Sequence, residues 1–261
     1  MKKSKLARLI AAICCFAMLL TACSSNQTSA ESGGDGSTTA DSEKKVLTYA
    51  IGAETTDLST LYMNNSLYCT SKLVYENLVD FDNGEIVPGL AESWEYNDDQ
   101  TELTFHLRQG VTFHNGEPFN AEAVKTNLEH KQSNPSFYSL KGITDIQEIE
   151  VVDEYTITLH YDHPFYAYLQ DFCWPDVNPM SAPEYIIPGD FQTISGVAGT
   201  GPYIYDEYVA GEYTRFVRNE DYWGETPYWD EIIVKYIPDS TSRLQALQTG
   251  EIDMIYGSTL L

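Results

Sequence analysis

The chain has 261 residues, of which 15 are Lys or Arg and 39 are Asp or Glu, and its formal net charge is −24. A surface this acidic repels nucleic acids and anionic lipid headgroups, which excludes nucleic-acid-binding proteins and proteins that dock on anionic membranes. Residues 1–22 hold four basic residues and no acidic ones, so the rest of the chain has a charge of 11 − 39 = −28.

The first 23 residues have the layout of a secretory signal peptide. Four basic residues precede an apolar run at 9–20, which is too short and wrongly flanked for a transmembrane helix, and the run ends in Leu20-Thr21-Ala22-Cys23. This ending resembles the bacterial lipoprotein box, and the resemblance implies that lipid is attached to the Cys23 thiol and that cleavage occurs before Cys23. We therefore expect a signal peptide at 1–22 and a lipid anchor in the bilayer at Cys23. An ordinary signal cleavage near this point is the alternative.

Residues 23–45 predict a flexible tether, because they are rich in Ser, Thr, Gly and acidic residues and contain no large apolar side chain. After Cys23, only Cys69 and Cys173 remain in the chain, and neither lies in a CxxC or zinc-like spacing. A disulfide between them and two buried thiols are both compatible with the sequence.

The globular part begins after Lys45 and mixes strands with helices without a regular βαβ rhythm, which indicates an α/β protein with non-sequential sheets. We predict helices at 66–78, at 121–131 with Asn120 as N-cap, and at 240–249 with Ser240 as N-cap and Gly250 at the C-terminal end. The strands that we predict lie at 46–51, 101–107, 146–152, 155–160, 203–208, 213–218, 231–237 and 252–256, with a short extended piece at 85–90.

No enzyme motif is present: the sequence lacks GxSxG, HExxH and a Gly-rich phosphate loop. His160 and His163 form the closest histidine pair, but their spacing at a strand end places them on opposite faces before Pro164. We therefore predict no catalytic residue, no cofactor and no metal site. A lipid-anchored surface protein of another class, an adhesin or a hydrolase, is the competing hypothesis, although the chain shows neither repeats nor a nucleophile motif.

Four groups of segments, in this order and spacing, resemble the extracytoplasmic solute-binding proteins of peptide and nickel ABC transporters, the family-5 group. The similarity extends from about residue 46 to the end of the chain and is strongest toward the nickel-binding members. The segments are 74–79 with 86–94, 103–108 with 111–124, 199–203, and 217–224 followed by 237–239, Arg243 and 248–253.

The resemblance implies an α/β, two-lobed periplasmic-binding-protein-like (type II) fold that encloses ligand between its lobes. It further implies that 46–84 and 196–261 form the sheet lobe and that 85–195 form the extra domain of this group. We expect the opposite lobe to be missing, because it normally follows later in the chain; a non-functional truncated fragment is therefore a further alternative. The implied partners are a small-molecule or peptide ligand and ABC permease subunits, with the protein acting as a monomer outside the cytoplasmic membrane, at the cell surface or in the periplasm.

The family motifs predict scaffold rather than ligand contacts. Trp94 is expected in the core, Tyr222 and Trp223 are expected to cover a core edge, and Gly199 and Gly201 are expected to supply backbone φ values that other residues avoid.

The ligand is predicted from the segments expected to face the cleft. Residues 131–141 and 174–180 contain no arginine, and Asp176 lies in the second segment. The resemblance to the nickel-binding members implies arginines that hold the carboxylates of a nickel chelate, and the sequence departs from that pattern here. An uncharged, cationic or peptide-like ligand fits this composition better. The candidate ligand contacts are Tyr62, Tyr68, Tyr138 and Trp174, and a packing role is an equal alternative for each.

Overall fold

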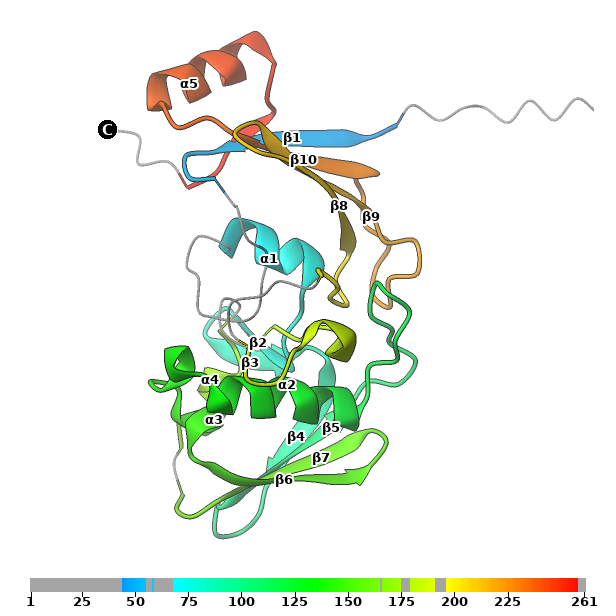
Figure 1. Ribbon diagram of the computed structural model, residues 1–261, viewed down its shortest axis with the longest axis vertical. Coiled ribbons are helices and arrows are strands. Elements are labelled where there is room, and N and C mark those ends of the chain that lie inside the picture. Colours follow the sequence, from blue (N-terminus) through cyan, green and yellow to red (C-terminus); the bar gives the residue numbers. More distant parts are fainter. Residues whose placement is uncertain are drawn as a thin grey trace, which may run out of the picture. The chain divides into compact units, whose positions relative to one another are not determined.

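The structure is a computed structural model that describes residues 44–54, 58, 68–164, 166–174, 179–190 and 196–257, without the side chains of Tyr68 and Cys69. The predicted signal peptide, Cys23 and most of the predicted tether lie outside these residues. Figure 1 shows the course of the chain. Within the described ranges, no helix has the length and apolar character needed to cross a membrane.

A five-stranded sheet carries both ends of the described chain. Its order is β11-β1-β10-β9-β8, so strands that are distant in sequence lie side by side. β1 pairs in parallel with β10 and β11, whereas β8, β9 and β10 pair antiparallel. This non-sequential order confirms the predicted class. The strands span Val46–Ile51 (β1), Tyr203–Val209 (β8), Tyr213–Arg218 (β9), Glu231–Tyr236 (β10) and Met254–Ile255 (β11).

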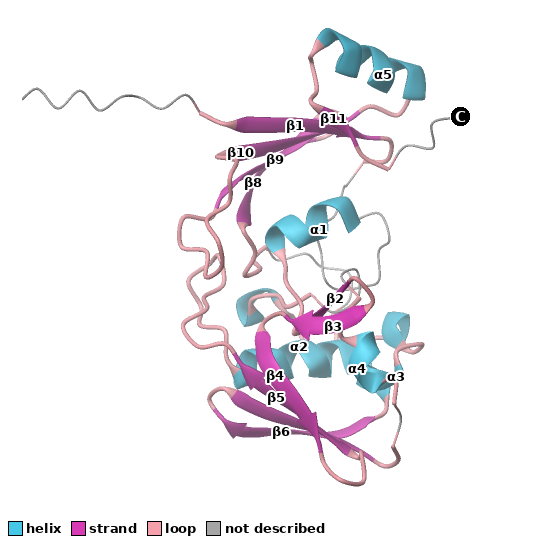
Figure 2. Cartoon of the chain, turned by 180° about the vertical axis from the view of Figure 1, so that it is seen from behind, coloured by secondary structure: helices cyan, strands magenta, loops and turns pink. Residues whose placement is uncertain are grey.

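Helices cover the two faces of this sheet, α1 (Tyr68–Val74) on one face and α5 (Ser240–Thr249) on the other (Figure 2). Side chains of a strand alternate between faces, and β1 follows this rule. Tyr49 and Ile51 join the buried cluster that contains Val74, whereas Ala50 packs with Ala246 of α5. The alternation of β1 and β10 therefore decides which side chains meet α1.

A second, four-stranded antiparallel sheet has the order β4-β5-β7-β6 and packs its buried face against α2. A large apolar cluster, which includes Phe105, Leu128 and Phe172, fills the space between them. Trp94 packs against this cluster, as predicted. The elements are β2 (Val79–Asp82), β3 (Glu85–Pro88), β4 (Ala91–Tyr96), β5 (Glu102–Leu107), α2 (Ala121–Ser133), η2 (Pro135–Phe137), α3 (Lys141–Thr144), β6 (Ile146–Asp153), β7 (Thr156–Tyr161), α4 (Tyr168–Asp171) and η3 (Pro183–Tyr185).

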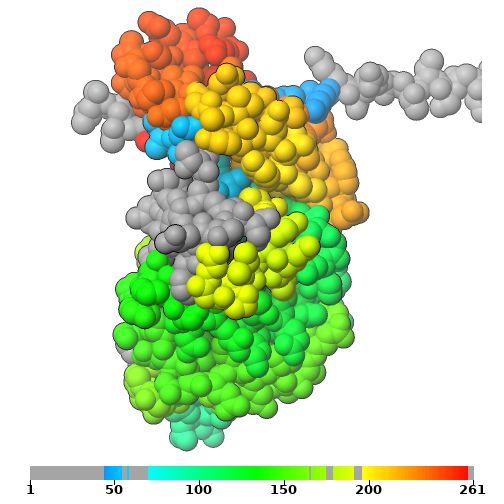
Figure 3. Space-filling view, in the orientation of Figure 1, coloured from blue at the N-terminus to red at the C-terminus, as the bar shows by residue number. Residues whose placement is uncertain are grey.

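Two buried polar side chains of α2 hold the segment that precedes η3. The Asn127 amide donates to the Ser181 carbonyl at 2.8 Å and accepts from the Ser181 N–H at 2.9 Å, which imitates a strand pairing. Lys131 Nζ donates to the Pro179 carbonyl at 2.8 Å. In Figure 3 the segment before residue 200, drawn in yellow, lies against the green surface of the part of the chain that includes α2.

Helix caps and helix ends show where local signals decide the structure. Asn120 caps α2 as predicted, with its side-chain oxygen accepting from the Ala123 N–H at 3.0 Å. The predicted cap of α5 is wrong by one residue: Asp239 accepts from the Ser242 N–H at 2.8 Å, and Ser240 is already helical. Gly250 ends α5 at φ +76°, as predicted.

The first predicted helix is too long at its C-terminal end. α1 stops at Val74 because the Val74 carbonyl accepts from the Gly201 N–H at 2.9 Å instead of from a further helical turn. The last predicted strand, at 252–256, shrinks to Met254–Ile255, and strands β2 and β4 were not predicted.

Glu76 joins three of the segments that carried the family resemblance. Its carboxylate accepts from Thr200 Oγ1 at 2.8 Å, from Tyr222 Oη at 2.7 Å and from Trp223 Nε1 at 2.7 Å. Burial raises the pKa of Glu76, although the three hydrogen bonds oppose that rise. The Arg108 guanidinium lies 4.5 Å from the Trp223 ring centre and covers the junction. The motifs thus meet at one partly buried carboxylate, and Trp223 packs against the core edge as predicted.

The predicted reason for Gly199 and Gly201 is wrong. Neither residue is among those with positive φ. Instead, both pass so close to the end of α1 that a Cβ atom would lie 2.0 Å from the Val74 carbonyl oxygen at Gly199 and 2.7 Å from it at Gly201. Close approach of two backbones, and not a special backbone conformation, requires these glycines.

We expect Gly199→Ala to lower the free energy of unfolding by about 3 kcal/mol, because the backbone of α1 must move to admit the methyl group. Gly110→Ala is the matched control: Gly110 has φ +75° but nothing lies within 4 Å of its added Cβ, so only the left-handed backbone cost of about 1 kcal/mol applies. Urea denaturation of both variants measures the difference. Equal losses would contradict the close-approach explanation.

Cys173 is a free, buried thiol whose Sγ donates to the Leu169 carbonyl at 3.7 Å. Burial raises the pKa of this thiol to about 11. A disulfide between Cys69 and Cys173 was one of two possibilities compatible with the sequence. Cys173 is a buried free thiol, which agrees with the other possibility. The side chain of Cys69 is not described.

Candidate binding site at the sheet edge

A pocket lies at the carboxyl edge of the five-stranded sheet, on the face that carries α1. Because β1 and β10 are parallel and in register, their last residues, Ile51 and Tyr236, lie opposite each other at this edge. The β8–β9 hairpin turns at the same edge, since Tyr213 pairs with Val209 and with Lys235. Ligands of open α/β sheets bind beyond the carboxyl ends of strands. The pocket is lined by Ile51, Glu54, Tyr208, Tyr213, Thr214, Val234 and Tyr236.

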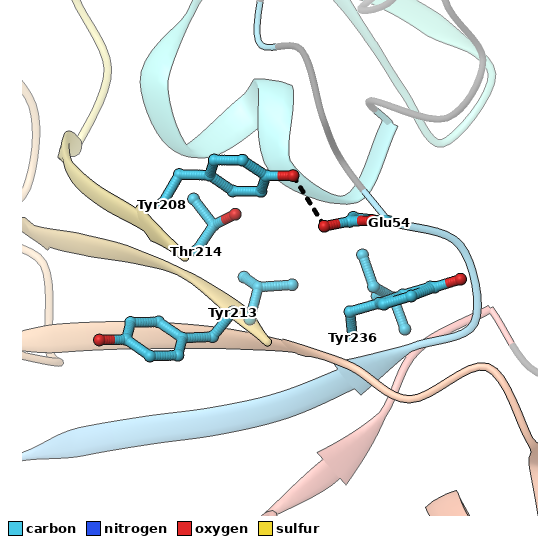
Figure 4. A pocket seen from close by; sticks show the side chains of 7 residues that line it. Glu54, Tyr208, Tyr213, Thr214 and Tyr236 are labelled. Atoms are coloured by element: carbon cyan, nitrogen blue, oxygen red, sulfur yellow. Dashed lines mark hydrogen bonds between the residues drawn. The ribbon is translucent and has the colours of Figure 1, made fainter. Parts of the chain in front are cut away.

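Glu54 follows β1 and reaches the tip of the β8–β9 hairpin (Figure 4). Its Oε1 accepts from Tyr208 Oη at 2.7 Å and from the Gly211 backbone N–H. These two donors lower the pKa of Glu54, with the Gly211 N–H as the larger cause. The carboxylate is thus held in place by the hairpin and is ionised at neutral pH.

Apart from Thr214, the other lining residues are aromatic or aliphatic. Tyr213 Oη donates to Glu207 at 2.9 Å, and Glu207 also pairs with Arg215 at 3.0 Å, so this second carboxylate is already neutralised. Lys235 lies between two lining residues of β10, but its side chain belongs to the opposite face, where it pairs with Glu251 at 2.9 Å. The pocket is a shallow hollow: its empty space of about 200 Å³ includes solvent outside the protein surface.

The two predicted ligand contacts whose side chains are described do not line this pocket. Tyr62 lies outside the described residues, and Tyr68 begins α1 with a side chain that is not described. Tyr138 and Trp174 are exposed, with 61% and 59% of their surface accessible, and belong to the part of the chain around α3 and α4. Both remain predictions as ligand contacts.

The sequence analysis missed Glu54 and the tyrosines of the pocket. Glu54 follows a predicted strand, which is a usual place for a ligand contact, but only the pairing of β1 with β10 shows that residues near 210 and 236 share its edge.

The histidine pair behaves as a pair of separate polar contacts. His160 bridges two carboxylates, with Nε2 at 2.9 Å from Glu150 and Nδ1 at 3.5 Å from Glu102, whereas His163 contacts Asp162. Where the structure is described, no group of three or more His, Cys, Asp or Glu side chains is arranged to hold a metal ion.

A mixed sheet with its pocket at the carboxyl edge, joined to a second sheet domain, is the architecture of type II periplasmic binding proteins. Residues 85–260 match the family described as bacterial extracellular solute-binding proteins, family 5 Middle. The chain belongs to this family of extracellular solute-binding proteins.

Individual relatives agree with this assignment. The nickel-binding periplasmic protein of Escherichia coli is 36% identical over 206 residues, which cover 76% of this chain and 38% of the relative. Heme-binding protein A of Haemophilus influenzae is 32% identical over 216 residues, which cover 73% of this chain and 39% of the relative. The chain therefore spans about two fifths of the length of these relatives.

Solved structures show the same fold. NikA from Brucella suis, in complex with Fe(III)-EDTA, superposes with a TM-score of 0.73 at 33% sequence identity. The superposition covers 80% of this chain and 43% of the NikA chain. DppA from Helicobacter pylori, in complex with the peptide STSA, superposes with a TM-score of 0.68 at 28% sequence identity. That superposition covers 80% of this chain and 46% of the DppA chain. The ligands named for these relatives include metal chelates and peptides.

Proposed function

We propose that this chain belongs to the substrate-binding lipoprotein of an ABC importer. It captures a peptide or nickel-chelate-type solute outside the cytoplasmic membrane and delivers it to the permease, without changing the solute chemically. Membership of the family over residues 85–260 carries this proposal. The pocket at the carboxyl edge of the sheet supports it, because it is the edge where open α/β sheets bind ligands.

An uptake experiment tests this proposal in the cell. Deletion of the coding sequence is expected to abolish or strongly reduce uptake of one solute class, measured with labelled di- and oligopeptides in parallel with radioactive nickel supplied as a chelate. Reintroduction of the complete gene of the lipoprotein should restore that uptake. Unchanged uptake of every solute in the deletion strain would contradict the proposed role.

The isolated 261-residue polypeptide is expected to bind solutes more weakly than a micromolar dissociation constant, which corresponds to about 8 kcal/mol. Two-lobed binders gain affinity when a hinge motion closes both walls over the ligand, and this polypeptide spans about two fifths of the relatives' length. Titration calorimetry with di- and oligopeptides and nickel chelates measures the affinity. Micromolar or tighter binding would show that this part alone suffices.

The same proposal includes lipid attachment at Cys23, based on the basic start, the apolar run and the Leu20-Thr21-Ala22-Cys23 box. Two or more acyl chains would provide a stable anchor, because a single chain holds a protein only marginally. Metabolic labelling with a fatty-acid analogue should mark the protein, and Cys23→Ala should remove the label. Cys15→Ala is the matched control and should leave the label in place. A label that persists in Cys23→Ala refutes the assignment.

A further inference from the structure

The dipeptide Asn-Gly occurs twice in this chain, at Asn83–Gly84 and at Asn115–Gly116, and both times a glutamate follows. In this dipeptide the backbone nitrogen after the asparagine can attack the side-chain amide carbon, and glycine adds no Cβ atom that would hinder the attack. The reaction needs an available backbone N–H, an available side-chain amide and a backbone that is able to rotate. The structure separates the two dipeptides on these requirements, although their sequences are alike.

Asn83 and Gly84 form the two-residue turn between β2 and β3, and both residues are exposed. Asn83 has φ +49° and Gly84 has φ +92°, which is the left-handed conformation that turns of this length favour. Among the described residues, neither the Asn83 side-chain amide nor the Gly84 N–H has a hydrogen-bond partner. No hydrogen bond therefore has to break before these two groups react.

The tip of this hairpin is also able to open. β2 and β3 form a separate two-stranded sheet with four residues in each strand, and a hairpin of this kind is only marginally stable. Asp82 and Glu85, the last pair before the turn, place like charges opposite each other, which weakens the pairing there. The other end of the hairpin is fixed, because the Gly89 and Ala91 N–H groups donate to the Leu78 carbonyl at 3.1 and 2.8 Å. Opening is thus confined to the turn.

The second dipeptide is hydrogen-bonded at both reacting groups. Asn115 Nδ2 donates to Glu117 at 3.0 Å and to Glu184 at 3.1 Å, and Asn115 Oδ1 accepts from the Glu117 N–H at 3.2 Å. The Gly116 N–H, which would be the attacking group, donates to the Phe113 carbonyl at 2.8 Å. Two of these bonds have a carboxylate as acceptor, and such bonds are the stronger ones. All of them oppose the rotation that brings the Gly116 nitrogen to the side-chain carbon.

We infer that Asn83 is a site of spontaneous deamidation by water, and that the folded structure protects Asn115 from the same reaction. The Gly84 nitrogen gives its proton to a base in solution and forms a bond to Asn83 Cγ. The Cγ–Nδ2 bond breaks, and the nitrogen takes a proton from solvent and leaves as ammonia. Water then opens the resulting succinimide ring at either carbonyl, which yields aspartate or isoaspartate without any oxidation or reduction. Both products add a negative charge to the turn, and isoaspartate also inserts one methylene group into its backbone.

The test follows both asparagines in the same folded 261-residue polypeptide, incubated at pH 8 and sampled over time. Peptide mapping by mass spectrometry reports each site separately, and chromatography distinguishes aspartate from isoaspartate. We expect Asn83 to react at least about tenfold faster than Asn115, because the loss of even one hydrogen bond to a charged group corresponds to a factor of that order. Both products should form at Asn83.

Two controls connect this difference to the structure. In guanidinium chloride the two sites should react at similar rates, because both stand in the sequence Asn-Gly-Glu. Asn83→Gln should abolish the fast reaction in the folded protein and leave the rate at Asn115 unchanged.

Equal rates at the two sites in the folded protein would overturn the inference. So would an Asn83 that stays intact for as long as the denatured chain needs to react. Formation of aspartate without isoaspartate would contradict the ring mechanism, since direct hydrolysis of the side chain gives aspartate alone. A rate difference that persists in guanidinium chloride would show that the sequence, and not the hydrogen bonds of the fold, decides which asparagine reacts.

Discussion

Glu76→Ala is expected to lower the free energy of unfolding by about 3 kcal/mol. The substitution leaves three donors, on Thr200, Tyr222 and Trp223, without their common acceptor. A buried donor that loses its acceptor costs about 1–3 kcal/mol. Thr200 is buried, whereas Tyr222 and Trp223 are partly buried and reach water in part, so their share of the loss is smaller. Because the donors come from two segments that are both far from Glu76 in the sequence, loss of the acceptor weakens the junction between the two sheet domains.

Glu92→Ala is the matched control for this prediction. Glu92 pairs with Arg108 at 3.5 Å, with 59% of its side chain exposed, and exposed pairs contribute about 0–1 kcal/mol. Chemical denaturation of both variants at pH 7 gives the two losses. If Glu76→Ala were as mild as Glu92→Ala, Glu76 would not be the element that joins the family motifs.

The second large effect concerns Lys131, which is fully buried with the Pro179 carbonyl as its hydrogen-bond acceptor. Burial lowers the pKa of Lys131 from 10.5 to about 7. Between these two values the unfolded chain binds a proton that the folded protein does not, so a rise in pH favours the folded state. We expect the unfolding free energy of the wild type, relative to Lys131→Met, to rise by roughly 4 kcal/mol between pH 7 and pH 10.

At pH 7 and below, Lys131→Met is expected to be the more stable protein, because methionine removes a buried charge while it fills similar space. Lys125→Met on the same helix is the control, since Lys125 is partly exposed and pairs with Glu129 at 3.8 Å. Its stability relative to the wild type should not change with pH over this range. A difference between Lys131→Met and the wild type that stays constant from pH 7 to pH 10 would contradict a buried, neutralised lysine.

Local signals in the sequence predicted much of the secondary structure but not the site. The helix after Asn120 and the stop at Gly250 were predictable because a cap acts within one turn. The end of α1 was not, because it depends on the Gly201 N–H from a distant segment. Glu54 was missed for the same reason: its partners, Tyr208 and Gly211, meet it only after β1 pairs with β10.

The resemblance to the family predicted the fold class, yet the motifs that carried it describe the scaffold. Glu76, Thr200, Tyr222 and Trp223 hold one another and do not line the pocket. Residues that contact different solutes in different relatives have no reason to share one pattern. The identity of a relative's ligand therefore transfers less well than its fold.

The measurement that tests the solute-binding role most directly is a residue-resolved NMR titration of the polypeptide with di- and oligopeptides and nickel chelates at millimolar concentration. We expect one class of solute to shift amide resonances saturably at the carboxyl edge of the five-stranded sheet, around Ile51, Tyr208 and Gly211. The amino edge, at Lys45 and Asp230, which bind each other through their backbones, should stay unchanged. Shifts confined to the amino edge, or no saturable shift with any solute, would contradict a binding site at the carboxyl edge.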